Sequence, residues 1–230
     1  EQEKIADILT SVDDTIEHTQ AQVAKLQDLK TATMNELLTK GIGHTEFRES
    51  ELGMIPTTWK ILELGALGQT FNGLTGKTSK DFGEGELFLN YLQVANQNLD
   101  DKERCGRVRI DEDDSQNRCQ YGDILVTTSS ETPDEVGMIS VFLETDWFPY
   151  LNSFCFGLRP AHFNDLLPEF GNYIFRGQEF RKSMLPLAQG STRFNLSKGY
   201  FKGLKIVVPP LEEQEKIADI LTSVDDTIEH

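Results

Sequence analysis

The segment EQEKIADILTSVDDTIEH occupies residues 1–18, and the same eighteen letters return at residues 213–230. One period of this repeat is 212 residues long and holds one candidate helix and one candidate globular body. The simplest account is a repeating unit of a domain followed by a helix. On this account the chain carries one full period and part of the next.

The first copy of the repeat opens a stretch without proline or glycine that runs to Gly41, which predicts a long helix over 1–42. Its apolar residues are spaced by three and four, as in a coiled coil with polar interruptions, and 40 helical residues span about 60 Å. We expect a second helix over 211–230, aimed by the stiff pair Pro209-Pro210. Together the expected contact residues, called the seam below, are Ile5, Leu9, Val12, Ile16, Val23, Leu26, Leu37, Ile217, Leu221, Val224 and Ile228. The seam has three candidate partners: the chain's own globular body, the other helix, or a second chain.

Residues 43–210 between the helices are predicted to form one globular domain, because glycines, aromatic residues and short strand-like runs replace the helical pattern. The strand candidates are 87–94, 105–110, 122–128, 137–143, 153–159 and 203–209, and one helical stretch covers about 166–184. The predicted fold class is therefore α+β, with a mixed or mostly antiparallel sheet between two helices.

The formal net charge of −16 argues at face value against nucleic-acid binding, but the charge is unevenly distributed. Residues 211–230 carry seven acids and one base, whereas residues 170–205 carry seven bases and the single acid Glu179. The three cysteines form no CxxC pair and are interpreted as free thiols, which favours a cytoplasmic location. Neither a signal peptide nor an apolar run long enough for a membrane span is present in the sequence.

Candidate catalytic and metal-binding motifs are incomplete. The run DEDDSQ (111–116) alternates acids like a calcium loop, but its sixth residue is Gln116 where glycine is needed. The pair Pro133-Asp134 opens like a nuclease motif without the acid and lysine that would complete it. Neither a histidine in triad spacing nor a glycine-rich phosphate loop is found. We therefore expect no catalytic residue, no metal and no cofactor on this chain.

The stretch LAQGSTRFNLSKGYFKGLKIVVPPLEEQ (187–214) is basic and contains a small polar turn, Gly190 to Thr192, which suits a phosphate contact. Its order of G-S-T-x-x-N-L, a strand, P-P-L-x-E-Q and then a helix resembles the DNA-specificity (S) subunit of type I restriction-modification systems. The segments 43–65, YLQVANQN (91–98) and GDILVTT (122–128) resemble further blocks of the same family. The resemblance covers nearly the whole chain.

The resemblance implies a non-catalytic subunit. Family members are similar in having two target recognition domains, each reading half of a bipartite DNA site, separated by two helices that act as a spacer. Those helices also hold methyltransferase (M) subunits, which bind S-adenosylmethionine, while a restriction (R) subunit cuts DNA. Because this chain holds one such domain, we expect either a portion of a longer subunit or a half-length subunit that forms a homodimer through its helices.

The expected contacts to double-stranded DNA lie in polar loops. They are Gln189, Ser191, Thr192, Arg193 and Lys198, then Asn72, Lys77 and Lys80, then Asn96 and Asn98, and finally Thr128, Ser129 and Ser130. The acid-rich helices keep one alternative open, a coiled-coil adaptor that does not bind DNA. A stand-alone hydrolase or nuclease is the third hypothesis and has no motif in its favour.

Overall fold

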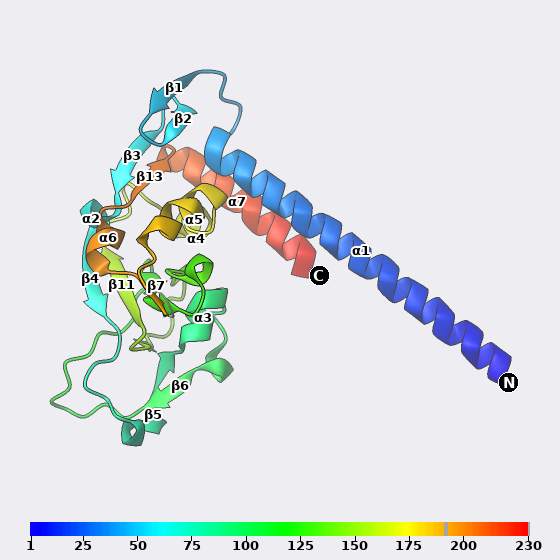
Figure 1. The fold of residues 1–230 in the computed structure, drawn as a ribbon, viewed down its shortest axis with the longest axis horizontal. Coiled ribbons are helices and arrows are strands. Elements are labelled where there is room, and N and C mark those ends of the chain that lie inside the picture. The colour runs from blue at the N-terminus through cyan, green and yellow to red at the C-terminus, as the bar shows by residue number, and fades with distance from the viewer. Residues whose placement is uncertain (191–192, 230) are drawn as a thin grey trace.

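The computed structural model describes residues 1–190 and 193–229, and two helices dominate its outline (Figure 1). Helix α1 (Gln2–Lys40) projects from the globular body. Helix α7 (Leu211–Glu229) lies along the C-terminal half of α1. The two helices are antiparallel, since Glu213 at the start of α7 contacts Ile42 just after α1, and Asp225 near the end of α7 pairs with Lys30 of α1 (Figure 1). The prediction of two helices flanking an α+β domain is confirmed.

Helix α1 ends at Gly41, where both the backbone angle and the available space require glycine. Its φ is 69°, in the left-handed region, and its N–H donates to the carbonyl of Leu37 at 3.1 Å. A Cβ atom at Gly41 would lie 2.4 Å from Oε1 of Glu213 and 2.7 Å from the ring of Trp59. This close approach fixes the angle at which the helix leaves the domain.

The strands form several small sheets around a central antiparallel one. The central sheet has the order β4-β11-β7-β9, and its strands are β4 (Gly68–Asn72), β11 (Cys155–Pro160), β7 (Ile124–Thr127) and β9 (Ile139–Val141). A second sheet, β10-β5-β6, joins β10 (Tyr150–Leu151), β5 (Phe82–Leu89) and β6 (Gly106–Val108). Three pairs complete the set: β1 (Phe47–Ser50) with β2 (Gly53–Pro56), β3 (Lys60–Glu63) with β13 (Lys205–Val208), and β8 (Ser129–Ser130) with β12 (Phe194–Asn195). Since β5 and β10 run parallel and the other pairs antiparallel, the sheets are mixed, as predicted.

Two sequence predictions about local structure were wrong in part. The predicted strand 87–94 ends at Leu89, and helix α3 (Tyr91–Asn96) follows. The helix starts here because Asn90 caps it: the Asn90 side chain accepts from the backbone N–H of Gln93, and the Gln93 side chain accepts from the backbone N–H of Asn90. The predicted helix 166–184 is broken at 175–177 into two shorter helices. The remaining helices are α2 (Leu64–Leu67), α4 (Pro168–Ile174), α5 (Gln178–Met184) and α6 (Lys198–Lys202).

The main hydrophobic core lies between the central sheet and helices α4, α5 and α7. Ile217 and Leu221 of α7 are fully buried in it, beside Phe170 and Ile174 of α4. A smaller core around Leu89 fills the space between the central sheet and α3. The first half of α7 is thus part of the domain core as well as a partner of α1.

Candidate nucleic-acid interface and helix surface

One edge of the central sheet collects polar side chains from distant parts of the sequence. The register pairs Asn72 with Phe156 and Thr127 with Cys155, so β4 and β7 end where β11 begins. The pair β8–β12 continues from this edge and brings Arg193 and Lys198 to it. We call Asn72, Thr128, Phe154, Arg193 and Lys198 the edge cluster.

Hydrogen bonds fix the loops of the edge cluster. The backbone N–H and the hydroxyl of Thr128 both donate to the carbonyl of Phe154, at 2.9 and 2.8 Å, and the Thr128 carbonyl accepts from the N–H of Leu196 at 2.8 Å. The ammonium of Lys198 donates to the side-chain oxygen of Asn72, which ties α6 to the end of β4. Partial burial lowers the pKa of Lys198 below its ordinary value. The backbone here is held, while several side chains face outward.

The outward side chains of the edge cluster can make contacts of several kinds. Phe154 is 53% exposed, and the guanidinium of Arg193 lies 5.9 Å from the centre of its ring. Gln189 and Asn195 are also exposed, and their backbones pair with each other at 2.8 and 3.0 Å. A planar cation, amides and an aromatic face are the groups that read base edges in DNA grooves. The predicted residues Ser191 and Thr192 lie outside the described residues.

Other predicted contacts lie elsewhere or are engaged within the protein. The ammonium of Lys77 is bound to the carboxylate of Asp114, and only 6% of the Lys77 side chain is exposed. Ser129 and Ser130 are buried, and the Ser130 hydroxyl donates to Glu135 at 3.2 Å. The arrangement leaves these three side chains little access to an outside ligand.

Lys80, Asn96 and Asn98 are not members of the edge cluster. Lys80 is exposed on a short 3₁₀ turn, and the two asparagines lie at the C-terminal end of α3. That end of α3 is held by Arg176, whose guanidinium donates to the carbonyls of Val94 and Ala95 at 3.2 and 3.0 Å. Burial lowers the pKa of Arg176 to about 10.

The structure adds Phe154 and Asn195 to the exposed residues at this sheet edge, and neither was predicted from the sequence. The letters around Phe154, NSFCFG (152–157), indicate only the start of a strand, and its place beside Asn72 and Thr128 depends on the register of β11. Asn195 lies within the basic loop that was predicted, so its exposure follows from the neighbouring β12 pairing. Both positions need knowledge of strand order that the sequence does not contain.

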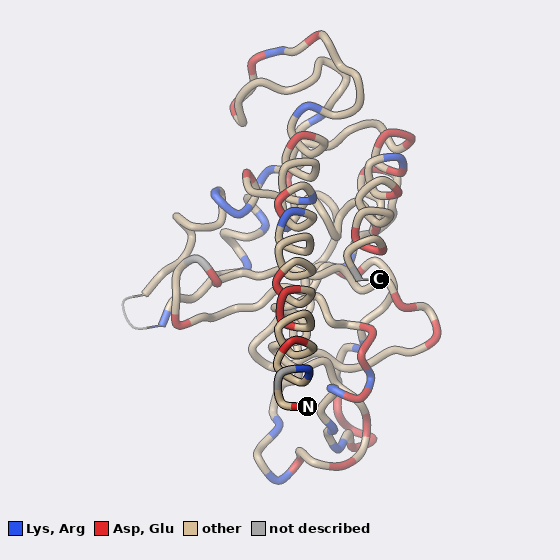
Figure 2. Tube along the Cα trace, turned by 90° about the vertical axis from the view of Figure 1, so that its right-hand side faces the viewer, with Lys and Arg blue, Asp and Glu red and all other residues tan. Residues whose placement is uncertain are grey.

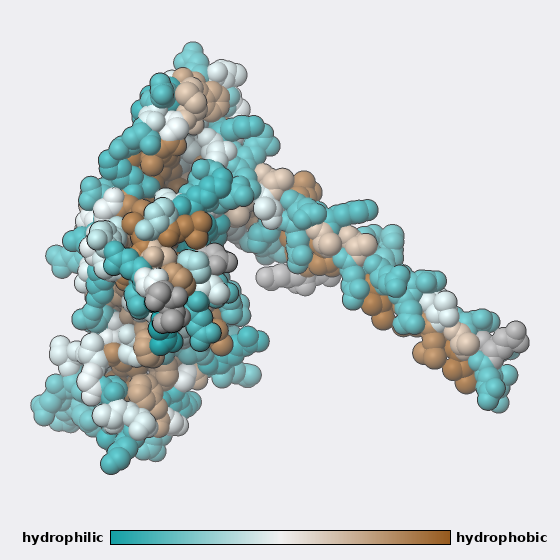
Figure 3. All heavy atoms as spheres, viewed as in Figure 1, coloured by the Kyte–Doolittle hydropathy of each residue, from teal (hydrophilic) through white to brown (hydrophobic). Residues whose placement is uncertain are grey.

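The two copies of the repeated segment lie in opposite environments. In α7 the seam residues Ile217 and Leu221 are fully buried, and Val224 and Ile228 are half-buried. The corresponding residues of the first copy are 47–59% exposed: Ile5, Leu9, Val12 and Ile16. Val23, Leu26 and Leu37 further along α1 are half-buried. Figure 3 shows hydrophobic atoms along the projecting part of α1, and Figure 2 shows acidic residues on both helices.

Glu213 joins the start of α7 to the end of α1. Its carboxylate accepts from the N–H of Ile42 at 2.9 Å and from the indole N–H of Trp59 at 3.1 Å, and it pairs with Nε2 of His44 at 2.8 Å. Farther along, Lys30 forms an ion pair with Asp225, whose carboxylate also accepts from the hydroxyl of Tyr173 at 3.1 Å. These contacts hold the helices in one register.

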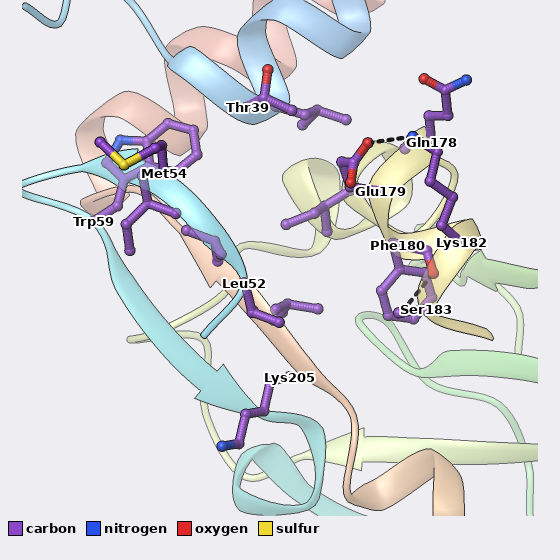
Figure 4. A pocket seen from close by; sticks show the side chains of 16 residues that line it. Thr39, Leu52, Met54, Trp59, Gln178, Glu179, Phe180, Lys182, Ser183 and Lys205 are labelled. Carbon is purple, nitrogen blue, oxygen red and sulfur yellow. Dashed lines mark hydrogen bonds and ion pairs between the residues drawn. The ribbon is translucent and has the colours of Figure 1, made fainter. Parts of the chain in front are cut away.

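A pocket of about 370 Å³ lies between α1, the β1–β2 hairpin, α5 and β13 (Figure 4). Leu52, Met54 and Phe180 make its wall apolar, and its lining includes neither histidine nor cysteine. The carboxylate of Glu179 is paired with Lys182 at 2.7 Å. The hydroxyl of Ser183, also in the lining, donates to the carbonyl of Phe180 at 2.7 Å.

Within the part of the chain that the structure describes, no cluster of three or more His, Cys, Asp or Glu side chains is arranged to hold a metal ion. None of the described helices combines the length and the apolar character needed to cross a membrane.

Known proteins similar to this chain are specificity subunits. Two proteins from Methanocaldococcus jannaschii, named "Putative type I restriction enzyme MjaX specificity subunit" and "Type I restriction enzyme MjaVIII specificity subunit", are 28% and 26% identical to this chain over 247 and 246 residues. Both matches cover 100% of this chain but 51% and 54% of the relatives, so the chain spans about half their length.

Solved structures show the same fold. The HsdS subunit from Thermoanaerobacter tengcongensis has a TM-score of 0.61 at 17% identity, covering 98% of this chain and 49% of that one. A chain from a study of complex assembly and conformational transition of the type I R-M system has a TM-score of 0.51 at 18% identity, covering 94% and 51%. Residues 56–230, well over half of the chain, match the family described as Type I restriction modification DNA specificity domain, and the chain therefore belongs to that family.

Proposed function

We propose that this chain reads one half of a bipartite DNA site as the specificity component of a type I restriction-modification complex. The observation that carries the proposal is the edge cluster, where three β-strand ends and a basic segment present exposed polar and aromatic side chains on a braced backbone. Family membership supports the same function.

The side chains of the cluster suit base reading better than strong phosphate binding. Arg193 of the edge cluster can donate two parallel bonds to guanine, and the exposed amides of Gln189 and Asn195 next to the cluster can pair with adenine in the major groove. The strongly acidic helices repel DNA phosphates, which limits sequence-independent affinity. We therefore expect the chain alone to bind DNA weakly and with strong salt dependence.

The partners in this proposal supply what the chain lacks. Methyltransferase subunits dock on the helices, contribute phosphate contacts and bind S-adenosylmethionine, and the restriction subunit joins through the complex in the cytoplasm. This chain contributes no catalytic residue and no cofactor site. The exposed seam of α1 also supports a homodimer when the chain is studied alone.

The test has two steps. The complex of this chain with its methyltransferase subunit first selects a DNA duplex from a random library, and fluorescence anisotropy then measures the affinity of the complex for that duplex. Arg193→Glu in the edge cluster is expected to weaken binding about 5- to 150-fold, which corresponds to the loss of about 1–3 kcal/mol from one base contact. The matched control is Lys182→Glu, an equal charge change on α5, whose exposed ion pair contributes little to stability.

Equal losses for Arg193→Glu and Lys182→Glu would mean that only net charge matters and would remove the edge cluster from the interface. A complex that selects no sequence at all would instead favour the adaptor hypothesis. Circular dichroism of both variants checks that neither change alters the fold.

A further inference from the structure

Helix α7 fills a groove of the domain, and the sequence that fills it, residues 213–230, also occurs at residues 1–18. The floor of the groove buries Ile217 and Leu221 completely. At its side Tyr173 contacts Thr222 at 3.0 Å and Asp225 at 3.1 Å. Because residues 1–18 repeat 213–230 without a change, the first copy holds every one of these groups, and its apolar ones are exposed.

The register of the two helices makes the first copy of a second chain fit as well. In repeat numbering Glu213 is position 1 and lies against Ile42, while Asp225 is position 13 and lies against Lys30. In both pairs the two positions add up to 43. If α1 of a second chain lies in this register, its position 13 meets Lys30, and its own Lys30 meets position 13 of the first chain.

This pairing maps onto itself under a two-fold axis, so it closes as a dimer and leaves no end open for further growth. Each α1 then runs antiparallel along the other, and each domain receives the first eighteen residues of its partner. The exposed seam residues Ile5 and Leu9 enter the place of Ile217 and Leu221.

We propose that residues 1–18 of a second copy of this chain replace α7 in its groove, and that α7 is an intramolecular competitor that limits dimer formation. The inference rests on the pairing of helices proposed above and is independent of DNA reading. The interactions that break when α7 leaves and those that form when the second copy enters involve identical side chains, so their free energies largely cancel. Two contributions to the free energy do not cancel. Burial of the middle of α1 favours the dimer, and the covalent link between α7 and its own domain favours the monomer.

The tether sets the concentration at which exchange occurs. A segment held next to its site by a short linker has an effective concentration in the millimolar range. We therefore expect the chain to be mainly monomeric at micromolar concentration and to exchange as the concentration approaches about 1 mM. Weakening α7 should move this transition to lower concentration.

Carbodiimide cross-linking distinguishes the two occupants of the groove. Lys30 can be joined to Asp225 within one chain or to Asp13 of a second chain, and trypsin places these acids in peptides 217–230 and 5–25, which differ in mass. Within a single α1 helix, Lys30 and Asp13 are about 25 Å apart, too far for a direct amide. A cross-link between Lys30 and peptide 5–25 therefore reports exchange.

At micromolar concentration we expect the unaltered chain to show a cross-link from Lys30 to peptide 217–230. At about 1 mM we expect the cross-link from Lys30 to peptide 5–25 to increase in the dimer fraction of a sizing column. A dimer that carries only the link to 217–230 would overturn the exchange while leaving helix pairing intact. A chain that stays monomeric at this concentration would overturn both.

Matched substitutions at one repeat position give a second test. Leu221→Asp weakens the resident helix and should lower the dimer dissociation constant at least tenfold, whereas Leu9→Asp weakens the incoming helix and should raise it at least tenfold. If both changes shift the constant in the same direction, the competition is refuted. If Leu221→Asp fails to fold, the cross-link in the unaltered chain still decides. Loss of DNA binding with exchange retained would refute the proposed function alone.

Discussion

Leu221 and Leu9 occupy the same place in the repeat, which allows one substitution to be compared in two environments. Leu221 is fully buried in the main core, and Leu9 is 59% exposed on the projecting part of α1. We predict that Leu221→Ala destabilises the chain strongly and that Leu9→Ala has little effect.

The size of the difference follows from burial. A leucine truncated in a packed core costs about 3–5 kcal/mol, because transfer free energy is lost and a cavity remains. For a chain of this size, a loss of that size lowers the melting temperature by roughly 6–20 °C. An exposed position such as Leu9 should change the free energy of unfolding by no more than about 0.5 kcal/mol.

The assay is urea unfolding followed by circular dichroism at micromolar concentration, where the chain is expected to be monomeric. The unfolding slope should stay constant while the midpoint of Leu221→Ala falls. Equal midpoints for Leu221→Ala and Leu9→Ala would refute the reasoning, because they would mean that the two copies are equally buried in solution.

Further predictions concern the helix ends and the thiols. Gly41→Ala should cost about 1–3 kcal/mol in urea unfolding, since it strains a left-handed residue and places a methyl group against a neighbouring carboxylate. Asn90→Ala should cost about 1 kcal/mol by the same assay, because α3 loses its cap. Burial raises the pKa of Cys155 to about 12 and that of Cys119 well above its usual value, and it also raises the pKa of the half-exposed Cys105. At pH 8 a thiol reagent should therefore label Cys105 first and the other two only on unfolding, and rapid labelling of all three in the folded chain would contradict this.

The sequence was sufficient to predict the long helix but not its environment. The absence of proline and glycine before Gly41 and the spacing of apolar residues are local signals, and α1 follows them closely. Burial is set by what lies opposite, and identical letters at Leu9 and Leu221 are exposed in one place and enclosed in the other. Local periodicity carries no information about that difference.

The candidate site was predictable where function left a compositional mark. The basic loop near Arg193 was found that way, and its position at the sheet edge agrees with a role in binding, which stays a prediction. Lys77 was predicted to contact DNA because the sequence around it is a glycine-rich loop. In the structure its ammonium is bound to the carboxylate of Asp114, which lies 37 residues farther along the chain. Phe154 was missed because strand register places it, and register is a property of the whole sheet.

The repeated segment has to be compatible with water and with a dry interior at once. A larger aliphatic residue that improved packing at Ile217 would, if copied at Ile5, add exposed apolar surface to the projecting part of α1. A charged residue that made Ile5 more soluble would, if copied at Ile217, unfold the core. As long as the two segments remain identical, every position in them is a compromise between these demands, which accounts for a narrow apolar stripe on an otherwise acidic helix.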